Sequence, residues 1–239
     1  MVRRMKHKTK MKEYPILFSA QMVRAILDRM KTQTRRPIPV LPKQNQSIHH
    51  IEKIDKYCFV TKHENGKVSG ISEYFRRPYN VGDRLWVRET WQGPLLDEDE
   101  TEADPDWIYH SEKYENVAHC YYKADGVAAP EYVDLDDNLR QGWMPSIHMP
   151  RWASRLTLEV KAIRAEPLHD ISDHDAMREG IYKSFDHGTA TDWDGNEKVL
   201  VAGVPRRDFE ELWRRLYPEG LKSWGMAPWV WVIDFEVVR

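Results

Sequence analysis

A dense polar segment, Lys31-Thr32-Gln33-Thr34-Arg35-Arg36-Pro37, places three cations and two hydroxyl groups directly after a short amphipathic stretch. Cationic donors gathered at a helix end can hold an anion, and a hydroxyl group beside a lysine can act as a nucleophile with its base. The same cations also stabilise the negative C-terminal end of a helix without any further function. From these residues alone, both interpretations stay open.

The spacing of Lys31 and Thr34 imposes a geometric condition on such chemistry. Side chains alternate between the two faces of a strand, so these two residues share a pocket only where the chain turns between them. The sequence contains no glycine-rich phosphate loop, no dinucleotide-binding fingerprint and no Gly-x-Ser-x-Gly motif. A nucleophilic role for Thr34 therefore depends on a local turn.

A second polar segment, residues 169–175, carries histidines and carboxylates of the types that bind metals. On a helix, His169 and His174 would point about 140° apart and would not converge on one ion. Helix capping explains the segment better, because Ser172 is a favourable N-cap and Asp175 stands at the N3 position of a capping box. We therefore predict a helix and no metal site.

Glu179 stands at the opposite end of that predicted helix. The helix should run from Asp173 to Glu179 and end at Gly180, which adopts the left-handed conformation easily. A carboxylate at the negative C-terminal end of a helix is unfavourable by roughly 0.3–1 kcal/mol unless a cation pairs with it. This placement marks Glu179 as a candidate functional residue, although exposed glutamates at helix ends are common.

Hydrophobic patterning predicts the elements that position these residues. Behind Ser19, a candidate N-cap, an apolar stripe from Met22 to Met30 predicts a helix that ends near Lys31. An Asn65-Gly66 turn predicts a hairpin, and a second amphipathic helix ends at Pro218. The predicted strands cover residues 57–60, 68–71, 84–88, 155–163 and 229–237, and the second helix covers 209–217.

The order of these elements predicts the fold class. Strands scattered along the chain with short helices between them favour an α+β fold with a mostly antiparallel sheet or a small β-barrel. Residues 93–146 are acidic, contain prolines and lack periodicity, so we predict an irregular insertion within a single domain of residues 14–239. Residues 1–13 are expected to form a basic disordered tail, with a nucleic-acid-binding arm as the alternative.

Composition limits the class of function. The chain of 239 residues is 41% hydrophobic and 31% charged with a net charge of −2, which is ordinary for a soluble protein and unlike a strongly basic nucleic-acid binder. Basic pairs such as Arg35-Arg36 still allow a local basic pocket. No apolar run is long enough to span a membrane, so no membrane partner is expected. Cys58 and Cys120 are the only cysteines, which excludes a disulfide scaffold and favours the cytoplasm.

Several motifs occur in an order that is similar to a known family. They are Lys31-Thr32-Gln33-Thr34-Arg35 after a helix, Val81-Gly82-Asp83-Arg84-Leu85, and a hydrophobic C-terminal strand, and together they resemble the ASCH domain. Three further motifs resemble ASCH-like proteins encoded by phages and prophages: Trp86-Val87-Arg88-Glu89-Thr90-Trp91, Met149-Pro150-Arg151-Trp152-Ala153-Ser154-Arg155 and Pro228-Trp229-Val230-Trp231-Val232. The resemblance covers residues 15–91 and 146–238. It implies a PUA-like fold, a small antiparallel β-barrel with short flanking helices, and a cleft that handles RNA or modified nucleosides.

The best-defined enzymes of that family are small N4-acetylcytidine amidohydrolases with a lysine, a threonine and a glutamate in the cleft. Carried over by motif, these residues correspond to Lys31, Thr34 and Glu179. The resemblance then implies that Thr34 attacks the amide carbonyl and that Lys31 takes the hydroxyl proton. Glu179 would orient Lys31 or pass a proton to the leaving amine. This chain is more than twice as long as those enzymes, so its substrate stays open.

The same comparison suggests substrate contacts and partners. Basic side chains would bind phosphate or carbonyl oxygens and indoles would stack on bases, from the set Arg35, Arg88, Glu89, Trp91, Arg151 and Trp152. The expected partner is a modified nucleoside or RNA. We expect no metal, cofactor or obligate protein partner, a monomeric chain, and a place in the cytoplasm, that of the host if a phage encodes it. The alternatives are a non-catalytic module that binds RNA or a modified base, and a ribonuclease that uses the same cleft.

Overall fold

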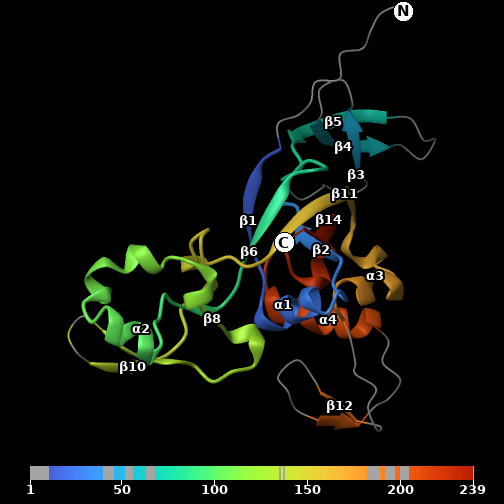
Figure 1. Ribbon diagram of the computed structural model, residues 1–239. Coiled ribbons are helices and arrows are strands. Elements are labelled where there is room, and N and C mark those ends of the chain that lie inside the picture. Colours follow the sequence, from blue (N-terminus) through green and yellow to red (C-terminus); the bar gives the residue numbers. More distant parts are fainter. Residues whose placement is uncertain are drawn as a thin grey trace, which may run out of the picture. The chain divides into compact units, whose positions relative to one another are not determined.

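A computed structural model of the chain describes residues 11–39, 46–51, 56–62, 68–134, 136, 138–181, 189–191, 197–199 and 205–238 (Figure 1). The chain divides into two compact units. Unit 1 comprises residues 1–24, 82–159 and 237–239, and unit 2 comprises residues 25–81 and 160–236. The single-domain organisation and the disordered tail stay predictions, and residues 1–10 of that tail lie outside the described residues.

The main sheet is mixed and has five strands in the order β1-β6-β11-β14-β2, in which β14 spans Trp229–Val237 and β2 spans Gln33–Pro37. The prediction of a small antiparallel barrel is therefore wrong: β1 (Glu13–Leu17) runs parallel to β6 (Arg84–Arg88), and no closed barrel is seen among the described strands. β11 (Thr157–Pro167) pairs antiparallel with β6. Parallel pairing needs a long crossover connection, and the many residues between β1 and β6 supply one, which alternation within single strands does not reveal.

Unit 1 adds short elements to its part of this sheet. A two-stranded pair, β7 and β8, packs the indole of Trp91 into a buried cluster with Tyr122, Met149 and Ala153. The elements of the predicted insertion are β8 (Tyr121–Tyr122), α2 (Glu98–Ala103), β9 (Glu131–Val133), β10 (Leu139–Gln141) and the 3-10 helices Trp107–Tyr114, Val117–His119 and Lys123–Asp125; β7 (Trp91–Gln92) precedes them, and a 3-10 turn, Ser146–His148, follows.

Unit 2 holds the remaining elements. Its core joins Val230 and Val232 of β14 to Phe209 and Trp213 of α4, and α3 contacts both α4 and β2 (Figure 1). The elements are β2 (Gln33–Pro37), β3 (Gln46–Ile51), β4 (Lys56–Lys62), β5 (Val68–Phe75), α3 (Asp173–Arg178), β12 (Thr189–Thr191), β13 (Glu197–Val199), α4 (Pro205–Leu216), β14 (Trp229–Val237) and the 3-10 helices Leu168–Asp170 and Trp224–Met226; α1 (Ala20–Leu27) begins in unit 1 and ends in unit 2. None of the helices in the described ranges combines the length and apolarity needed to cross a membrane.

Most elements predicted from periodicity are confirmed. The strands at 84–88 and 229–237 match β6 and β14, and β4 and β5 form the predicted antiparallel hairpin, whose turn lies outside the described residues. Within the predicted insertion, however, α2 is an ordered helix with a capping box between Asp97 and Glu100. The capping-box residues can be found in the sequence, but the helix was not predicted because α2 is rich in carboxylates, buries no residue and has no apolar stripe.

The polar segment that follows α1 is a strand rather than a loop. β2 spans Gln33–Pro37 and pairs antiparallel with β14, with Gln33 opposite Asp234 and Thr34 opposite Ile233. Hydrophobic patterning did not predict this strand because its buried residues Gln33, Thr34 and Arg35 are all polar. Hydrophobic periodicity cannot identify a strand that buries polar side chains against polar partners.

Two helices end close to the start of β2 in the same way. The main-chain N–H of Met30 donates to Ala25 O at 2.8 Å, with Arg29 in the left-handed region at φ 58°. At the end of α3, Ile181 N–H donates to Ala176 O at 3.2 Å, with Gly180 at φ 85°. These are Schellman turns, in which a left-handed residue closes the helix and redirects the chain. They place Lys31 and Glu179 where both helices stop.

Replacing Gly180 by alanine should therefore destabilise the protein more than the same change at another left-handed glycine. A Cβ on Gly180 would lie 2.9 Å from Ala25 Cβ and 3.1 Å from Lys31 Cβ, whereas one on Gly220, at φ 79°, meets nothing within 4 Å. Both changes cost about 1–2 kcal/mol of left-handed strain, and only Gly180→Ala adds overpacking of about 1–3 kcal/mol. Urea denaturation of Gly180→Ala and of the control Gly220→Ala measures the unfolding free energy that each variant loses. Equal losses would contradict the close packing around Gly180.

Candidate functional site

The candidate site of unit 2 is centred on a lysine and a glutamate that are both buried. Lys31 is 1% exposed and Glu179 is 4% exposed. Lys31 Nζ donates to Glu179 Oε2 at 2.8 Å, to the main-chain oxygen of Glu179 at 2.7 Å and to the main-chain oxygen of Gln33 at 2.8 Å. Three acceptors therefore surround an ammonium group that has three hydrogens to donate.

The position of Glu179 at the end of α3 explains why this lysine is held there. Ser172 caps the start of α3 by accepting from Asp175 N–H at 3.0 Å, which confirms Ser172 as the N-cap. The Asp175 carboxylate pairs with Arg35 and Arg164, and the predicted return contact of a capping box is not seen among its described contacts. α3 ends at Arg178, and Glu179 is its C-cap. Lys31 binds both the carboxylate and the main-chain carbonyl of this C-cap, so it supplies the cation that the negative end of the helix requires.

Arg35 joins the same site from β2. Its Nη1 donates to Glu179 Oε1 at 3.1 Å and to Gln33 Oε1 at 2.6 Å, and its Nη2 donates to Glu166 Oε1 at 2.6 Å. Asp175 Oδ2 lies 3.3 Å from Nη2. The Arg35 side chain is fully buried, with its guanidinium carbon 5.9 Å from the centre of the Phe209 ring. Arg35 is therefore enclosed by three carboxylates, which compensate its burial.

A second layer of ion pairs surrounds this core and includes residues that the sequence did not single out. Arg164 pairs with Glu166 at 3.0 Å and with Asp234 at 3.2 Å. Asp234 also accepts from Gln33 Nε2 at 2.8 Å and pairs with Arg178 at 2.6 Å. Strand alternation could have placed Arg164 and Glu166 on one face of β11, but their partners come from distant elements that no local pattern connects.

The electrostatics of the site follow from burial and pairing. Burial lowers the pKa of Lys31 below its ordinary value, with Arg36 and Arg35 acting in the same direction, while Glu179 opposes the shift. For Asp175, burial acts upward, but Arg35 and Arg164 together lower its pKa. The site is therefore a desolvated lysine beside a carboxylate, within a network whose four cations (Lys31, Arg35, Arg164, Arg178) face four carboxylates (Glu166, Asp175, Glu179, Asp234).

Thr34 occupies a different face of β2 from Gln33 and Arg35. Its hydroxyl forms no hydrogen bond with Lys31 or Glu179 among the described contacts, and its cross-strand partner is the buried Ile233. Carbonyl groups of a strand lie in the plane of the sheet. The Gln33 carbonyl accepts from the Lys31 amine, which also donates to Glu179 Oε2, and the other Glu179 carboxylate oxygen accepts from Arg35. The described contacts of the amine therefore join it to Glu179 beside Arg35 rather than to Thr34.

The other predicted contact residues belong to unit 1. Glu89 is 1% exposed and forms a bidentate pair with Arg155 at 3.0 and 3.1 Å. Arg88 donates to Ile147 O and lies 5.5 Å from the Trp86 ring. Trp91 is buried, and its Nε1 has no hydrogen-bond partner among the described atoms. Glu89 and Trp91 are therefore buried within unit 1 and expose little surface to a substrate.

Arg151 and Trp152 complete that set. Arg151 pairs with Glu13 at 3.3 Å and lies 5.9 Å from the Trp86 ring, so its guanidinium is partly used within unit 1. Trp152 is half-buried and packs edge-to-face against Trp91 with ring centres 5.5 Å apart. The structure therefore brings together Lys31, Arg35 and Glu179 in unit 2, and Arg88, Glu89, Trp91, Arg151 and Trp152 belong to unit 1.

The histidine-rich segment near α3 has a packing role. His169 Nε2 lies 2.9 Å from Trp224 O, and the two rings are 4.7 Å apart. Across the described part of the chain, no group of three or more His, Cys, Asp or Glu residues is arranged to hold a metal ion. The chemistry that the site itself offers is proton exchange between a lysine and a carboxylate and the binding of a polar group by buried donors.

Breaking the Lys31–Glu179 pair from either side should be strongly destabilising. Lys31→Met leaves Glu179 with one fewer partner, and Glu179→Gln leaves the buried ammonium without its countercharge, each at a cost of about 3–5 kcal/mol in unfolding free energy. The double variant should lose less stability than the sum of the two single losses, because it leaves neither a buried lysine nor a buried glutamate without its partner.

Urea denaturation of the four proteins in this double-mutant cycle measures the coupling. The matched control is the exposed Arg214–Glu210 pair of α4, at 2.7 Å, whose removal should change stability by about 1 kcal/mol or less. Additive single losses at Lys31 and Glu179 would show that the two groups do not interact.

Glu89 should give the protein a measurable dependence of stability on pH. Burial raises its pKa above the ordinary value of 4.5, although Arg155 opposes the shift. Above pH 4.5 and up to the raised pKa, the folded state binds more protons than the unfolded state, so the Glu89 contribution to stability falls as the pH rises. Glu89→Gln removes this contribution. The unfolding free energy of the wild type minus that of Glu89→Gln should therefore decrease with rising pH.

Urea titrations from pH 4.5 to about pH 8 test this expectation. Glu112→Gln removes the same charge from an exposed position of unit 1 and is the matched control for the charge change. A pH-independent difference for Glu89→Gln would contradict the shifted pKa.

Comparisons with known proteins assign no family to the chain. No protein-family model matches the sequence, no curated protein matches it significantly, and no solved structure matches the fold.

Proposed function

We propose that the protein is an amidohydrolase-like enzyme that acts on an N4-acylated pyrimidine nucleoside, free or within a nucleic acid. One observation carries the proposal: Lys31 Nζ lies 2.8 Å from Glu179 Oε2 with both side chains buried. A lysine whose pKa is lowered by burial beside a carboxylate is typical of sites that transfer protons. The resemblance of the Lys31–Arg35 segment to ASCH-domain amidohydrolases supports the same assignment.

In the proposed reaction, Thr34 Oγ1 attacks the acyl carbonyl carbon and the bond to the exocyclic amine breaks. The hydroxyl proton passes to Lys31 and then to the leaving amine, with Glu179 holding Lys31 in place or sharing its proton. Water then hydrolyses the acyl ester formed on Thr34, which restores the hydroxyl group and releases the carboxylic acid. For the transfer of the hydroxyl proton, the Lys31 amine must release Gln33 O and turn toward the Thr34 hydroxyl group. Arg35 holds the Glu179 carboxylate in place through its hydrogen bond to Oε1 at 3.1 Å.

A second candidate function is a module that binds RNA or a modified base without chemistry. The saturation of the network favours it: both Glu179 carboxylate oxygens and three Lys31 hydrogen bonds are already used within the protein. A network of this kind can fix β2 and α3 as a rigid support for a binding surface. This candidate needs the same fold but no proton transfer at Glu179.

Turnover and binding assays with N4-acetylcytidine separate the two candidates. For the enzyme, we expect release of cytidine and acetate, measured by chromatography, and a loss of about 10²–10⁴-fold in kcat/KM for Glu179→Gln. Thr34→Val removes the hydroxyl group at nearly constant volume and should abolish turnover while leaving the urea midpoint close to that of the wild type. The surface variant Arg214→Gln is the activity control.

Four outcomes test the role of Thr34, the role of Lys31, the binding module and the ribonuclease. Full turnover by Thr34→Val excludes Thr34 as the nucleophile, and full turnover by Lys31→Met excludes the lysine from proton transfer. Binding of the nucleoside, measured by calorimetry, without turnover in the wild type identifies the binding module. Cleavage of single-stranded RNA on a gel, lost in Lys31→Met, would instead identify a ribonuclease.

A further inference from the structure

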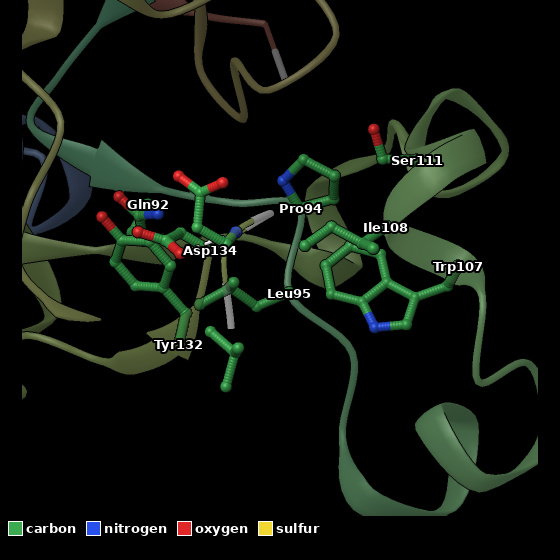
Figure 2. A pocket seen from close by; sticks show the side chains of 10 residues that line it. Gln92, Pro94, Leu95, Trp107, Ile108, Ser111, Tyr132 and Asp134 are labelled. Atoms are coloured by element: carbon green, nitrogen blue, oxygen red, sulfur yellow. Dashed lines mark hydrogen bonds between the residues drawn. The ribbon is translucent and has the colours of Figure 1, made fainter. Parts of the chain in front are cut away.

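Unit 1 contains a pocket that the proposed function does not use. Its volume is about 380 Å³, within the range of roughly 300–1,000 Å³ that small-molecule sites occupy. Its walls come from three segments that lie side by side around it in Figure 2. The apolar part of the wall consists of Pro94, Leu95, Trp107, Ile108, Tyr132 and Val133.

One buried polar group of the wall lacks a partner. Gln92 is 6% exposed, and its side-chain oxygen has no hydrogen-bond partner among the described atoms. Buried amide groups nearly always form hydrogen bonds, because an unpaired one loses its water without replacement. Gln92 belongs to β7, next to the buried Trp91, so the pairing of β7 with β8 holds its backbone in place. Gln92 lines the pocket, so a turn of its side-chain amide would present this oxygen to a donor on a bound molecule.

The charged groups of the pocket are carboxylates. Asp134 accepts a hydrogen bond from Arg140 at 2.7 Å, and this contact and neighbouring main-chain N–H groups lower its pKa to about 2. Asp136 donates its main-chain N–H to Asp134, but its own carboxylate has no hydrogen bond or ion pair among the described residues. Among the described residues that line the pocket, none is a lysine, arginine or histidine. The pocket therefore presents negative charge, which excludes phosphate and favours a cation.

The sequence around the pocket has the same sign of charge. Seven acidic residues and no basic residue lie between Asp97 and Asp106. Such a segment attracts cations and repels nucleic acid near the pocket. The aromatic rings of Trp107 and Tyr132 add surfaces that pack against flat apolar groups and attract cations through their π systems.

We propose that this pocket binds a small organic cation, an amine attached to an apolar or aromatic body. The ammonium group pairs with Asp136 and donates to the Gln92 side chain, and the body fills the apolar wall beside Trp107 and Tyr132. The acidic insertion is then a binding element, and it is independent of the Lys31–Glu179 site of unit 2.

The test uses three probes that share one body and differ in charge: 2-phenylethylamine, 2-phenylethanol and phenylacetate. Isothermal titration calorimetry with the full chain should show the tightest binding for the amine, weaker binding for the alcohol and none for the acid. Affinity for the amine should fall with added salt, because part of it is electrostatic and partly exposed to solvent.

Two variants and a matched control locate the binding. Asp136→Asn should weaken amine binding about two- to fivefold and leave alcohol binding unchanged. Ser111→Trp should fill the pocket and abolish binding of both. Asp99→Asn removes the same charge from an exposed position on α2 that does not line the pocket, so it should weaken amine binding clearly less than Asp136→Asn does.

Three results would overturn the proposal: no heat with the amine, equal affinity for amine and alcohol, or equal weakening by Asp136→Asn and Asp99→Asn. Circular dichroism of each variant verifies that it is folded. If Ser111→Trp does not fold, the comparison of Asp136→Asn with Asp99→Asn still decides the location of the site.

Discussion

The contact on which unit 2 depends is the burial of Lys31 against Glu179. It joins two chain turns that follow different helices, one after α1 and one after α3, and it satisfies the main-chain carbonyl of the α3 C-cap, Glu179, together with the carboxylate of the same residue. The desolvation of an ammonium group is costly, and three acceptors offset it only while both turns keep their geometry. Gly180 matters for the same reason, because its missing side chain lets Lys31 and Ala25 pack against the end of α3.

Arg35 extends this local constraint into a network. It binds carboxylates from β11, from the first turn of α3 and from its C-cap, so one guanidinium fixes a strand and both ends of a helix. The planar, permanently charged guanidinium suits this task better than a lysine would, since it can donate to several carboxylates at once. The equal number of cations and carboxylates keeps the buried region close to neutral, which is why so many charges are tolerated on one side of β2 and β14.

Unit 1 also contains a buried carboxylate that is paired with an arginine. In this pair of Glu89 with Arg155, the Arg155 guanidinium packs over Tyr122, with its carbon 4.0 Å from the centre of the ring. Trp91, Trp152 and Met149 form its small apolar core. Around this core, the acidic segments build a pocket whose polarity is opposite to that of a nucleic-acid site. The two units therefore offer distinct chemistry, one a compensated lysine and the other an uncompensated carboxylate.

The sequence by itself determined the elements whose side chains alternate or form a stripe, such as β6, β14 and α4, and the caps of α3, because these depend on local spacing and on the conformational preferences of Ser172 and Gly180. It also marked Lys31 and Glu179 separately, one by the density of cations and one by its unfavourable helix end. Only the tertiary structure decided that β2 is a strand, that β1 runs parallel to β6, and that Thr34 lies on the opposite face from Arg35. Those outcomes depend on partners far along the chain, such as Asp234 for Gln33, and a polar strand carries no periodic signal until its partner is in place.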